Sequence, residues 1–397
     1  MTRPSASCLV VEGSEVKLRL EAERLETGSA VHVDWLRFTV LLRNSPMLDE
    51  VEALWDGPVQ ADGIWDEQYR MKLLISNLRR LPNCEFAPSV QAAEFCREVC
   101  EALGPDFLPA AEPAKGHDFY RYRLPILRAG AEVGWIGYLA SGDSPRQAAQ
   151  ARTMHCNLYG MACTFAASGW RDRMADLIDK RAGVLTRCDL ALDFFDGMAR
   201  GMAGVVEDFE SGLCDVRGNR PKYNQLGRWA SDPGERSFYM GSKEAGKQTN
   251  VYEKGHQLFG AKSANPWIRI ELRYGNKLRV LPSDMLRRPA DFFSGASDWH
   301  AGKLREVAEV VKPEPVAVKP RLQLETVDAE VSRLLRWAKE TAGPTISTLF
   351  EYCGGLSFLE FVFAGRRPGR IGHFKESDIA SSFARLLPAE GVSPAFA

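Results

Sequence analysis

The stretch from Ser237 to Arg273 constrains the fold of this chain more than any other part of the sequence. It contains three short runs of residues typical of strands, and polar, glycine-containing turns separate them. The rest of the chain mixes strand and helix patterns without the regular alternation of a parallel, doubly wound sheet. We therefore predict an α+β fold with a mostly antiparallel central sheet flanked by helices. The three runs are Ser237–Gly241, Thr249–Lys254 and Trp267–Arg273.

The second and third runs bring chemically useful side chains together. Side chains alternate across a strand, so Tyr252 and Lys254 share one face of their run. By the same rule Glu271 lies between Arg269 and Arg273. A potential nucleophile, a potential metal ligand and phosphate-binding cations are thus presented on one sheet. An ordinary half-buried sheet would show the same pattern.

The remaining sequence divides into four segments. Residues 1–30 form a polar, acidic arm that we expect to be loosely ordered or strand-like, and residues 31–300 form the main domain. Residues 312–321 are a proline-rich linker, and residues 322–397 are a small helical region. Within the main domain we expect further strands, helices that include 48–56 and 65–77, and a basic surface loop over 215–235.

Composition indicates which compartment and which kinds of partner to expect. The 9 cysteines are dispersed without a C-x-x-C pair, which favours a reduced compartment. There is no signal-peptide pattern and no apolar run long enough to span a bilayer, so we expect a cytoplasmic protein without a membrane partner. The net charge is −1, yet residues 215–290 carry 15 Lys and Arg against 7 Asp and Glu. This local excess of cations suits a polyanion-binding face, although a solvated surface would also explain it.

One motif resembles a phosphate-binding loop. Residues 241–247 read G-S-K-E-A-G-K, but Gln248 stands where Ser or Thr should bind magnesium. A strand pattern follows, whereas a phosphate-binding loop must open a helix. We interpret the motif as a polar hairpin turn.

An acidic strand is the second candidate site. Asp189 and Asp193 share one face of the run 185–195, and hard carboxylate oxygens suit Mg²⁺ or Mn²⁺. Four residues of strand place their Cα atoms about 13 Å apart. One of them would need a partner on a neighbouring strand, and Glu271 is the natural candidate. The alternative is a solvated sheet face whose acidic residues pair with arginines.

Two tyrosines, Tyr239 and Tyr252, lie among lysines on the predicted sheet. A phenol ionises near pH 10 and needs a nearby cation, metal or base to act as a nucleophile. From periodicity alone, a tyrosine on a strand is usually a packing residue.

Four motifs in order resemble the replication initiation factor family of filamentous phages and rolling-circle plasmids. They are VDWLRFTV (33–40), LTRCDLALDFFDG (185–197), FYMGSKEAGKQTNVYEKGHQ (238–257) and WIRIELRYGNK (267–277). The resemblance implies an enzyme that nicks one strand of a double-stranded origin through a tyrosine, keeps the 5′ phosphate covalently bound and later rejoins the displaced strand. This chain has Asn250 where the family usually has arginine.

The resemblance also implies roles for particular residues. Tyr252 would be the nucleophile, with Lys254 beside it, and Mg²⁺ or Mn²⁺ would be held by carboxylates rather than by a histidine pair. Partners would be origin DNA, the nicked single strand, and a host helicase and polymerase; a homodimer is compatible. The alternative is a non-catalytic, origin-binding protein on the same scaffold. The predicted metal ligands are Asp189, Asp193 and Glu271, and the predicted DNA-binding residues are Lys222, Arg228, Lys243, Lys247, Arg269 and Arg273.

Overall fold

The computed structural model of the protein describes residues 6–44, 88–142, 144, 147, 150–230, 234–260, 263–307, 311–318, 321–353 and 368–386. The helices expected over 48–56 and 65–77 lie outside this part of the chain. Among the described residues, no helix has both the length and the apolar character needed to cross a bilayer.

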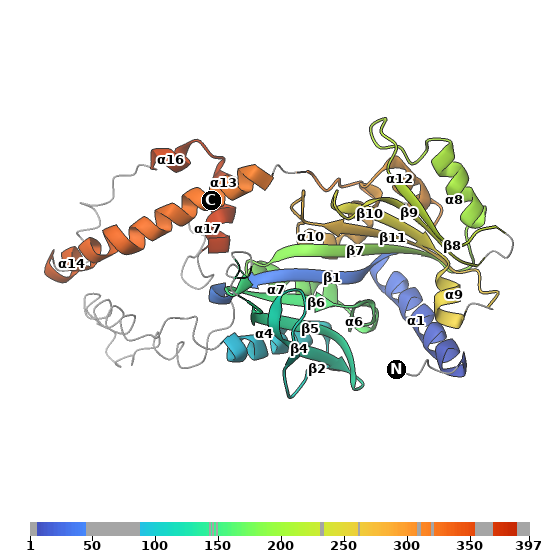
Figure 1. Ribbon diagram of the computed structural model, residues 1–397, viewed down its shortest axis with the longest axis horizontal. Coiled ribbons are helices and arrows are strands. Elements are labelled where there is room, and N and C mark those ends of the chain that lie inside the picture. Colours follow the sequence, from blue (N-terminus) through green and yellow to red (C-terminus); the bar gives the residue numbers. More distant parts are fainter. Residues whose placement is uncertain are drawn as a thin grey trace.

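A single antiparallel sheet of 11 strands forms the centre of the molecule (Figure 1). Its order is β2-β4-β5-β6-β1-β7-β11-β10-β9-β8, with β3 paired to β4, and every pair of neighbours runs antiparallel. This confirms the predicted fold class. The strands are β1 (Val31–Leu41), β2 (Phe107–Pro109), β3 (Ala114–Lys115), β4 (Tyr120–Arg128), β5 (Ala131–Ala140), β6 (Thr153–Leu158), β7 (Val184–Phe194), β8 (Tyr223–Arg228), β9 (Gly234–Ser242), β10 (Lys247–Tyr252) and β11 (Ile268–Gly275).

Helices cover one face of this sheet, and the core lies between them. Alternate residues of β1, such as Phe38, are buried on that face, and Phe38 meets Phe95 of a covering helix with ring centroids 6.0 Å apart. Farther along the sheet, Tyr274 of β11 donates a hydrogen bond to the Phe292 carbonyl at 3.1 Å. Burial of the apolar residues on one face leaves the polar residues between them on the other.

Several helices differ from the sequence expectations. Residues 6–27 of the arm predicted over residues 1–30 form the helix α1, which packs against α6, α9 and β1. The segment from residue 160 to residue 180 forms two separate helices, α6 and α7. The helices before the linker are α1 (Ala6–Thr27), α4 (Pro88–Leu103), α6 (Gly160–Phe165), α7 (Trp170–Lys180), α8 (Gly201–Glu210), α9 (Lys254–Phe259), α10 (Asp284–Arg287), α11 (Pro289–Ser294) and α12 (Asp298–Arg305), with a 3-10 turn η1 at Leu42–Asn44.

The basic segment 215–235 also differs from expectation, because it contains the edge strand β8 rather than only a loop. The G-S-K-E-A-G-K motif is a hairpin turn between β9 and β10, as the strand pattern after it indicated.

The C-terminal helices pack on one another and lie apart from the sheet (Figure 1). Helix α13 contacts α16 and α17, and Ser382 donates a hydrogen bond to Asp328 at 2.7 Å. Residues 311–318 connect them to the sheet without regular secondary structure. These helices are α13 (Arg321–Trp337), α14 (Gly343–Cys353), α16 (Gly369–Gly372) and α17 (Glu376–Leu386), with a π-helical turn η2 at Ala338–Ala342.

Candidate active site and basic groove

The face of the sheet opposite the core helices carries the predicted site residues of β7, β10 and β11. Register places Arg269 of β11 between Asp193 of β7 and Tyr252 of β10. Two residues along, Glu271 lies opposite Asn250. Neighbouring strands lie about 5 Å apart, so the strand pairing alone brings these side chains together.

The centre of this cluster is a buried ion pair. Arg269 is 1% exposed and Asp193 is 0% exposed, and the guanidinium donates to both Asp193 oxygens at 2.7 and 2.9 Å. Arg269 also donates to Asp34 of β1 at 2.5 Å. Trp267 Nε1 adds a hydrogen bond to Asp193 Oδ1 at 2.5 Å. Burial alone would raise the pKa of Asp193, but Arg269 and His32 outweigh burial and hold that pKa below its usual range.

Tyr252 lies beside Glu271 at the edge of this ion pair. Its hydroxyl is 3.5 Å from Glu271 Oε2 and donates toward it. Burial, with the nearby carboxylates, raises the pKa of Tyr252 well above its ordinary value. Burial, together with Asp34 and Asp189, raises the pKa of Glu271 to about 7. The pair can therefore share a proton, with Glu271 as acceptor.

Lys254 follows Tyr252 at the start of α9. Its ammonium lies 5.7 Å from the centre of the Tyr252 ring and donates to Gln257 Oε1 at 3.0 Å. Burial and the neighbouring Arg269 lower the pKa of Lys254 to about 8. The lysine is thus close to the tyrosine, and its charge is sensitive to pH near neutrality.

The three predicted metal ligands are not brought together as one set. Asp193 is taken up by Arg269 and Trp267, as described above. Asp189 is 0% exposed and accepts from Arg187 Nε at 2.8 Å and from Arg273 Nε at 3.2 Å. Arg273 also donates to Glu271 at 3.1 Å. No cluster of three or more His, Cys, Asp or Glu suited to a metal ion occurs in the described parts of the chain. Besides burial, Asp34 and Asp189 nevertheless raise the pKa of Glu271, while Arg273 and Arg269 lower it.

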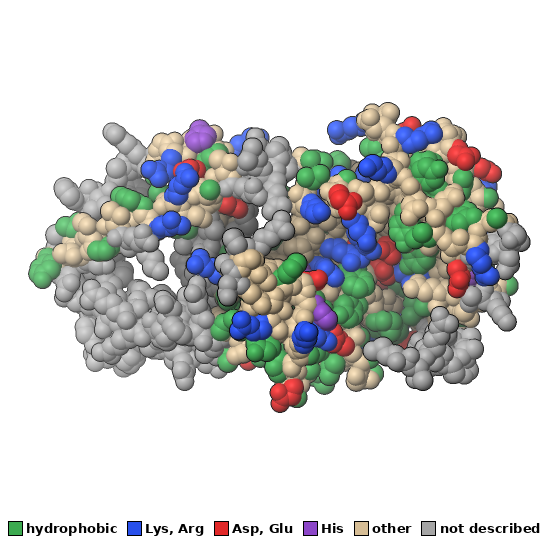
Figure 2. All heavy atoms as spheres, in the orientation of Figure 1, with side chains coloured by type: hydrophobic (Ala, Val, Ile, Leu, Met, Phe, Trp, Pro, Cys, Tyr) green, Lys and Arg blue, Asp and Glu red, His purple; other side chains and the backbone are tan. Residues whose placement is uncertain are grey.

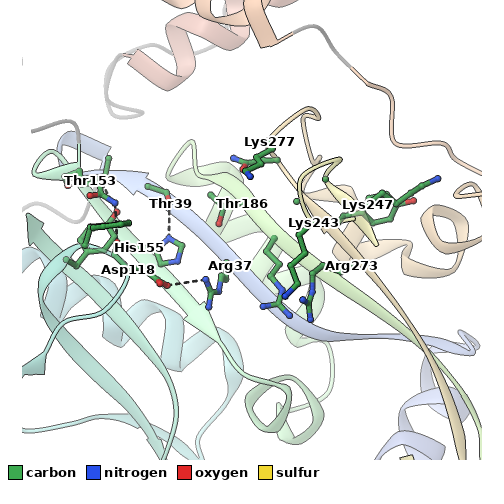
Figure 3. A pocket seen from close by; sticks show the side chains of 18 residues that line it. Arg37, Thr39, Asp118, Thr153, His155, Thr186, Lys243, Lys247, Arg273 and Lys277 are labelled. Atoms are coloured by element: carbon green, nitrogen blue, oxygen red, sulfur yellow. Dashed lines mark hydrogen bonds and ion pairs between the residues drawn. The ribbon is translucent and has the colours of Figure 1, made fainter. Parts of the chain in front are cut away.

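A groove with a volume of about 850 Å³ opens next to this cluster on the same side of the sheet (Figure 3). Its cations come from β1, β7, β11 and the turns after β9 and β11, and Lys and Arg side chains also gather over the middle strands in the space-filling view (Figure 2). Asp118 is the single carboxylate among the described residues that line the groove. Lys247 also lines the groove and is described below. The other cations of the lining are Arg37, Arg187, Lys243, Arg273 and Lys277.

The predicted DNA-binding residues fall into three environments. Lys243 and Arg273 line the groove and point the same way in Figure 3. Lys247 points away from them, and its ammonium donates to the Ala296 carbonyl at 2.8 Å. Arg269 is enclosed by Asp193 and Asp34, so it has no surface for a phosphate, contrary to expectation. Lys222 and Arg228 are exposed, away from the groove, beside and on the edge strand β8.

Three residues of the site escaped the sequence predictions. Asp34 and His32 come from β1, and His32 lies 3.5 Å from Asp193. Arg24 of α1 donates to the Asp193 carbonyl at 2.5 Å. The signal for Asp34 was its place inside the apolar run VDWLRFTV. Nothing local in the sequence of the first helix indicated that Arg24 reaches β7.

The comparison with family models supports the resemblance found in the sequence. Residues 183–360 match the family model described as replication initiation factor. A search of curated proteins gave no match. Among solved structures, the chain is similar to a rolling circle replication initiator protein from Geobacillus stearothermophilus, with 17% identity, 72% of this chain and 92% of that chain covered, and a TM-score of 0.38.

Proposed function

We propose that this protein initiates rolling-circle replication by nicking one DNA strand. The premise is that residues 183–360 match the family model of replication initiation factors. The observation that carries the proposal is the Tyr252 hydroxyl 3.5 Å from Glu271, beside a groove lined by cations. A buried phenol next to a proton acceptor, with a phosphate-binding surface at hand, suits attack on a phosphodiester.

The chemistry follows from these side chains. The Tyr252 oxygen attacks phosphorus while its proton passes to Glu271 Oε2, the oxygen toward which the hydroxyl donates. The bond to the 3′ oxygen breaks, this oxygen takes up a proton from water, and the DNA is left with a free 3′ hydroxyl and a 5′ phosphate on the tyrosine. Attack by a 3′ hydroxyl on this phosphotyrosine rejoins a strand and returns the phenol. The free 3′ end would serve a polymerase, and a helicase would displace the strand.

The proposal includes a divalent cation. Glu271 and Asp34 would hold Mg²⁺ or Mn²⁺, because their mutual repulsion is what a cation relieves. The ion would neutralise charge that develops on the nonbridging phosphate oxygens. Asp189 and Asp193, in this proposal, position Arg273 and Arg269 around Glu271 and Asp34. Lys254, where protonated, adds a positive charge beside the reacting tyrosine.

Covalent trapping tests the proposal. The protein is incubated with Mg²⁺ or Mn²⁺ and a random-sequence single-stranded DNA pool that carries a fluorophore at the 3′ end, and the products are separated under denaturing conditions. We expect the 3′ label to move with the protein, whereas a 5′ label does not. Tyr252→Phe should abolish the adduct. Tyr239→Phe is the matched control, because Tyr239 lies on the same face opposite Asn250 and should leave the adduct intact.

One observation favours the non-catalytic alternative, in which the protein binds DNA without cutting it. The pKa of Tyr252 is raised by burial, and Asn250 puts no positive charge opposite Glu271 to oppose this. Retention of the DNA pool in native gels with no denaturation-resistant adduct, under either metal, would establish that alternative. Loss of the adduct in Tyr239→Phe alone would instead move the nucleophile to Tyr239.

A further inference from the structure

The wall of the basic groove opposite the hairpin turn after β9 carries an exposed aromatic side chain on a strained backbone. Phe119 lines the groove and is 67% exposed. Phe119 has φ = +71° and the preceding Asp118 has φ = +51°, which side chains other than glycine rarely adopt. Two consecutive residues in this region are strained, and such strain persists where the surroundings impose it, often at binding sites.

The surroundings of this turn hold it in place. The Phe119 carbonyl accepts from the Ser141 backbone at 2.9 Å, and the Asp118 carbonyl accepts from Gln150 at 3.2 Å. The Asp118 carboxylate pairs with Arg37 of β1 at 3.1 Å. The turn is therefore fixed from both sides, and the phenyl ring remains over the groove without burial. An exposed ring among cations is the arrangement on which bases of single-stranded nucleic acid stack.

The floor of the groove holds a buried polar atom without a partner. His155 of β6 is 8% exposed, and its Nδ1 is 3.0 Å from the Thr39 hydroxyl. Its Nε2 is buried and has no hydrogen-bond partner in the protein. Tyr120 stacks on the imidazole at 5.9 Å with 12° between the planes, so the ring is held in one orientation. In Figure 3 the ring lies between Thr39 and the Asp118–Arg37 pair. A buried polar atom that is left unsatisfied is costly, and a ligand that reaches it removes that cost.

Arg273 connects the groove to the tyrosine. It lines the groove and donates to Glu271, toward which Tyr252 donates. A DNA strand whose phosphates contact Arg273 and Lys243 would therefore pass beside the residue that hydrogen-bonds the proton acceptor of Tyr252. Its bases would face the turn at Phe119 on the other wall.

We propose that the groove binds single-stranded DNA next to the cleaved phosphate, with one unpaired base stacked on Phe119 and its polar edge hydrogen-bonded to His155 Nε2. Single strands fit and duplexes do not, because a base in a duplex hides its face and its pairing edge and cannot reach a buried histidine. Phe119 then contributes affinity for any base, and His155 discriminates among bases. This inference rests on the proposed function only for the direction of the strand toward Tyr252.

Fluorescence anisotropy measures the binding. Labelled oligo-dT, oligo-dA and oligo-dC of equal length, and a mixed-sequence duplex, are titrated without divalent metal into Tyr252→Phe protein, so no cleavage is needed. In that background, Phe119→Ala should weaken single-strand binding about tenfold, the range of one stacked base, and leave duplex binding unchanged. Phe119→Trp should retain the affinity and show quenched tryptophan emission on binding. Tyr352→Ala is the matched control, because Tyr352 is 81% exposed on α14 and should have no effect.

The second part of the experiment tests His155 with the variant His155→Gln, and circular dichroism confirms that this variant is folded. We expect the ratios among the affinities for the three oligonucleotides to change while the mean affinity falls less than in Phe119→Ala. Equal losses for single-stranded and duplex DNA in Phe119→Ala, no loss at all, or no single-strand binding by the parent protein would overturn the proposal. A protein that needs Phe119 for single-strand binding yet forms no covalent adduct would refute the nicking function alone. Adduct formation with full single-strand affinity in Phe119→Ala would refute the stacking site alone.

Discussion

At the scale of single residues, Glu271 is the carboxyl group of the site whose pKa is raised by its surroundings. Its side chain is 12% exposed, and Asp34 and Asp189 add to the effect of burial on its pKa. Arg273 offsets part of this effect with a hydrogen bond at 3.1 Å. A carboxyl group whose pKa is raised on folding makes the folded state less stable when the group is ionised. Ionised Glu271 therefore lowers the stability of the folded sheet.

The pH dependence of stability tests this view. The pKa of Glu271 rises from 4.5 to about 7 on folding, so its stabilising contribution is complete below pH 4.5 and is lost as pH rises through about 7. We expect Glu271→Gln to raise the free energy of unfolding at pH 8 by up to about 3 kcal/mol and to flatten its dependence between pH 5 and pH 7. Urea unfolding at several pH values measures both effects.

Glu94→Gln is the control for that series. The Glu94 side chain on α4 is 39% exposed, and its ion pair with Arg97 lies at the surface, so the substitution should change stability by less than about 0.5 kcal/mol. Loss of stability in Glu271→Gln at pH 8 would show that the bond to Arg273 outweighs the repulsion from Asp34 and Asp189.

At the scale of elements, the hairpin of β9 and β10 positions one wall of the groove. Gly241 near the end of β9 has φ = +81°, and a Cβ there would lie 2.6 Å from the Lys247 carbonyl oxygen. Glycine is thus required both by conformation and by the close approach of the neighbouring strand. The turn that follows carries Lys243, so the glycine fixes where this cation lies.

Alanine substitution separates the two requirements. Gly130, in the turn between β4 and β5, has φ = +79° and nothing within 4 Å of an added Cβ. Gly130→Ala should cost about 1–2 kcal/mol, the penalty for a left-handed backbone alone. Gly241→Ala should cost about 1–3 kcal/mol more, because the clash is with backbone rather than with a flexible side chain. Denaturant midpoints of the two variants give the comparison, and equal costs would mean that the strands separate easily at Gly241.

At the scale of the whole molecule, the sheet and the C-terminal helices are linked through one short segment. Val311 and Val316 of this segment pack against the hydrophobic core. Between them, the Glu314 backbone donates to the Asp291 carbonyl at 2.9 Å. Beyond it, α13 packs against α16 and α17. The boundary of the sheet domain therefore lies after these contacts and not at the start of the linker.

Truncation tests this boundary. A chain that ends at residue 318 should keep the thermal unfolding midpoint of the sheet domain within a few degrees, because every contact of the linker with the core is retained. A chain that ends at residue 307 should lose about 1–3 kcal/mol, since Val311, Val316 and Glu314 are removed. Near-ultraviolet circular dichroism measures the tertiary unfolding. Equal midpoints for the two chains would place the boundary at residue 307 instead.

The sequence by itself determined the central strands, their antiparallel character and the shared face of the site residues on β7, β10 and β11. Alternation along β7, β10 and β11 is a local property, and it placed Asp189, Tyr252 and Glu271 on one side of the sheet. It also distinguished the hairpin turn of residues 243–246 from a phosphate-binding loop, because a strand pattern follows the motif.

Only the tertiary structure decided which of these side chains are free to bind a metal ion or a phosphate. Asp193 and Arg269 looked like a metal ligand and a phosphate contact, but they neutralise each other in the core of the site. Asp34, Arg24 and the groove between Phe119 and Lys243 bring together parts of the chain far apart in sequence. Pairing between strands and burial arise from contacts across the whole sheet. A periodic pattern fixes the direction of a side chain, but the partner it meets is set by the order of strands.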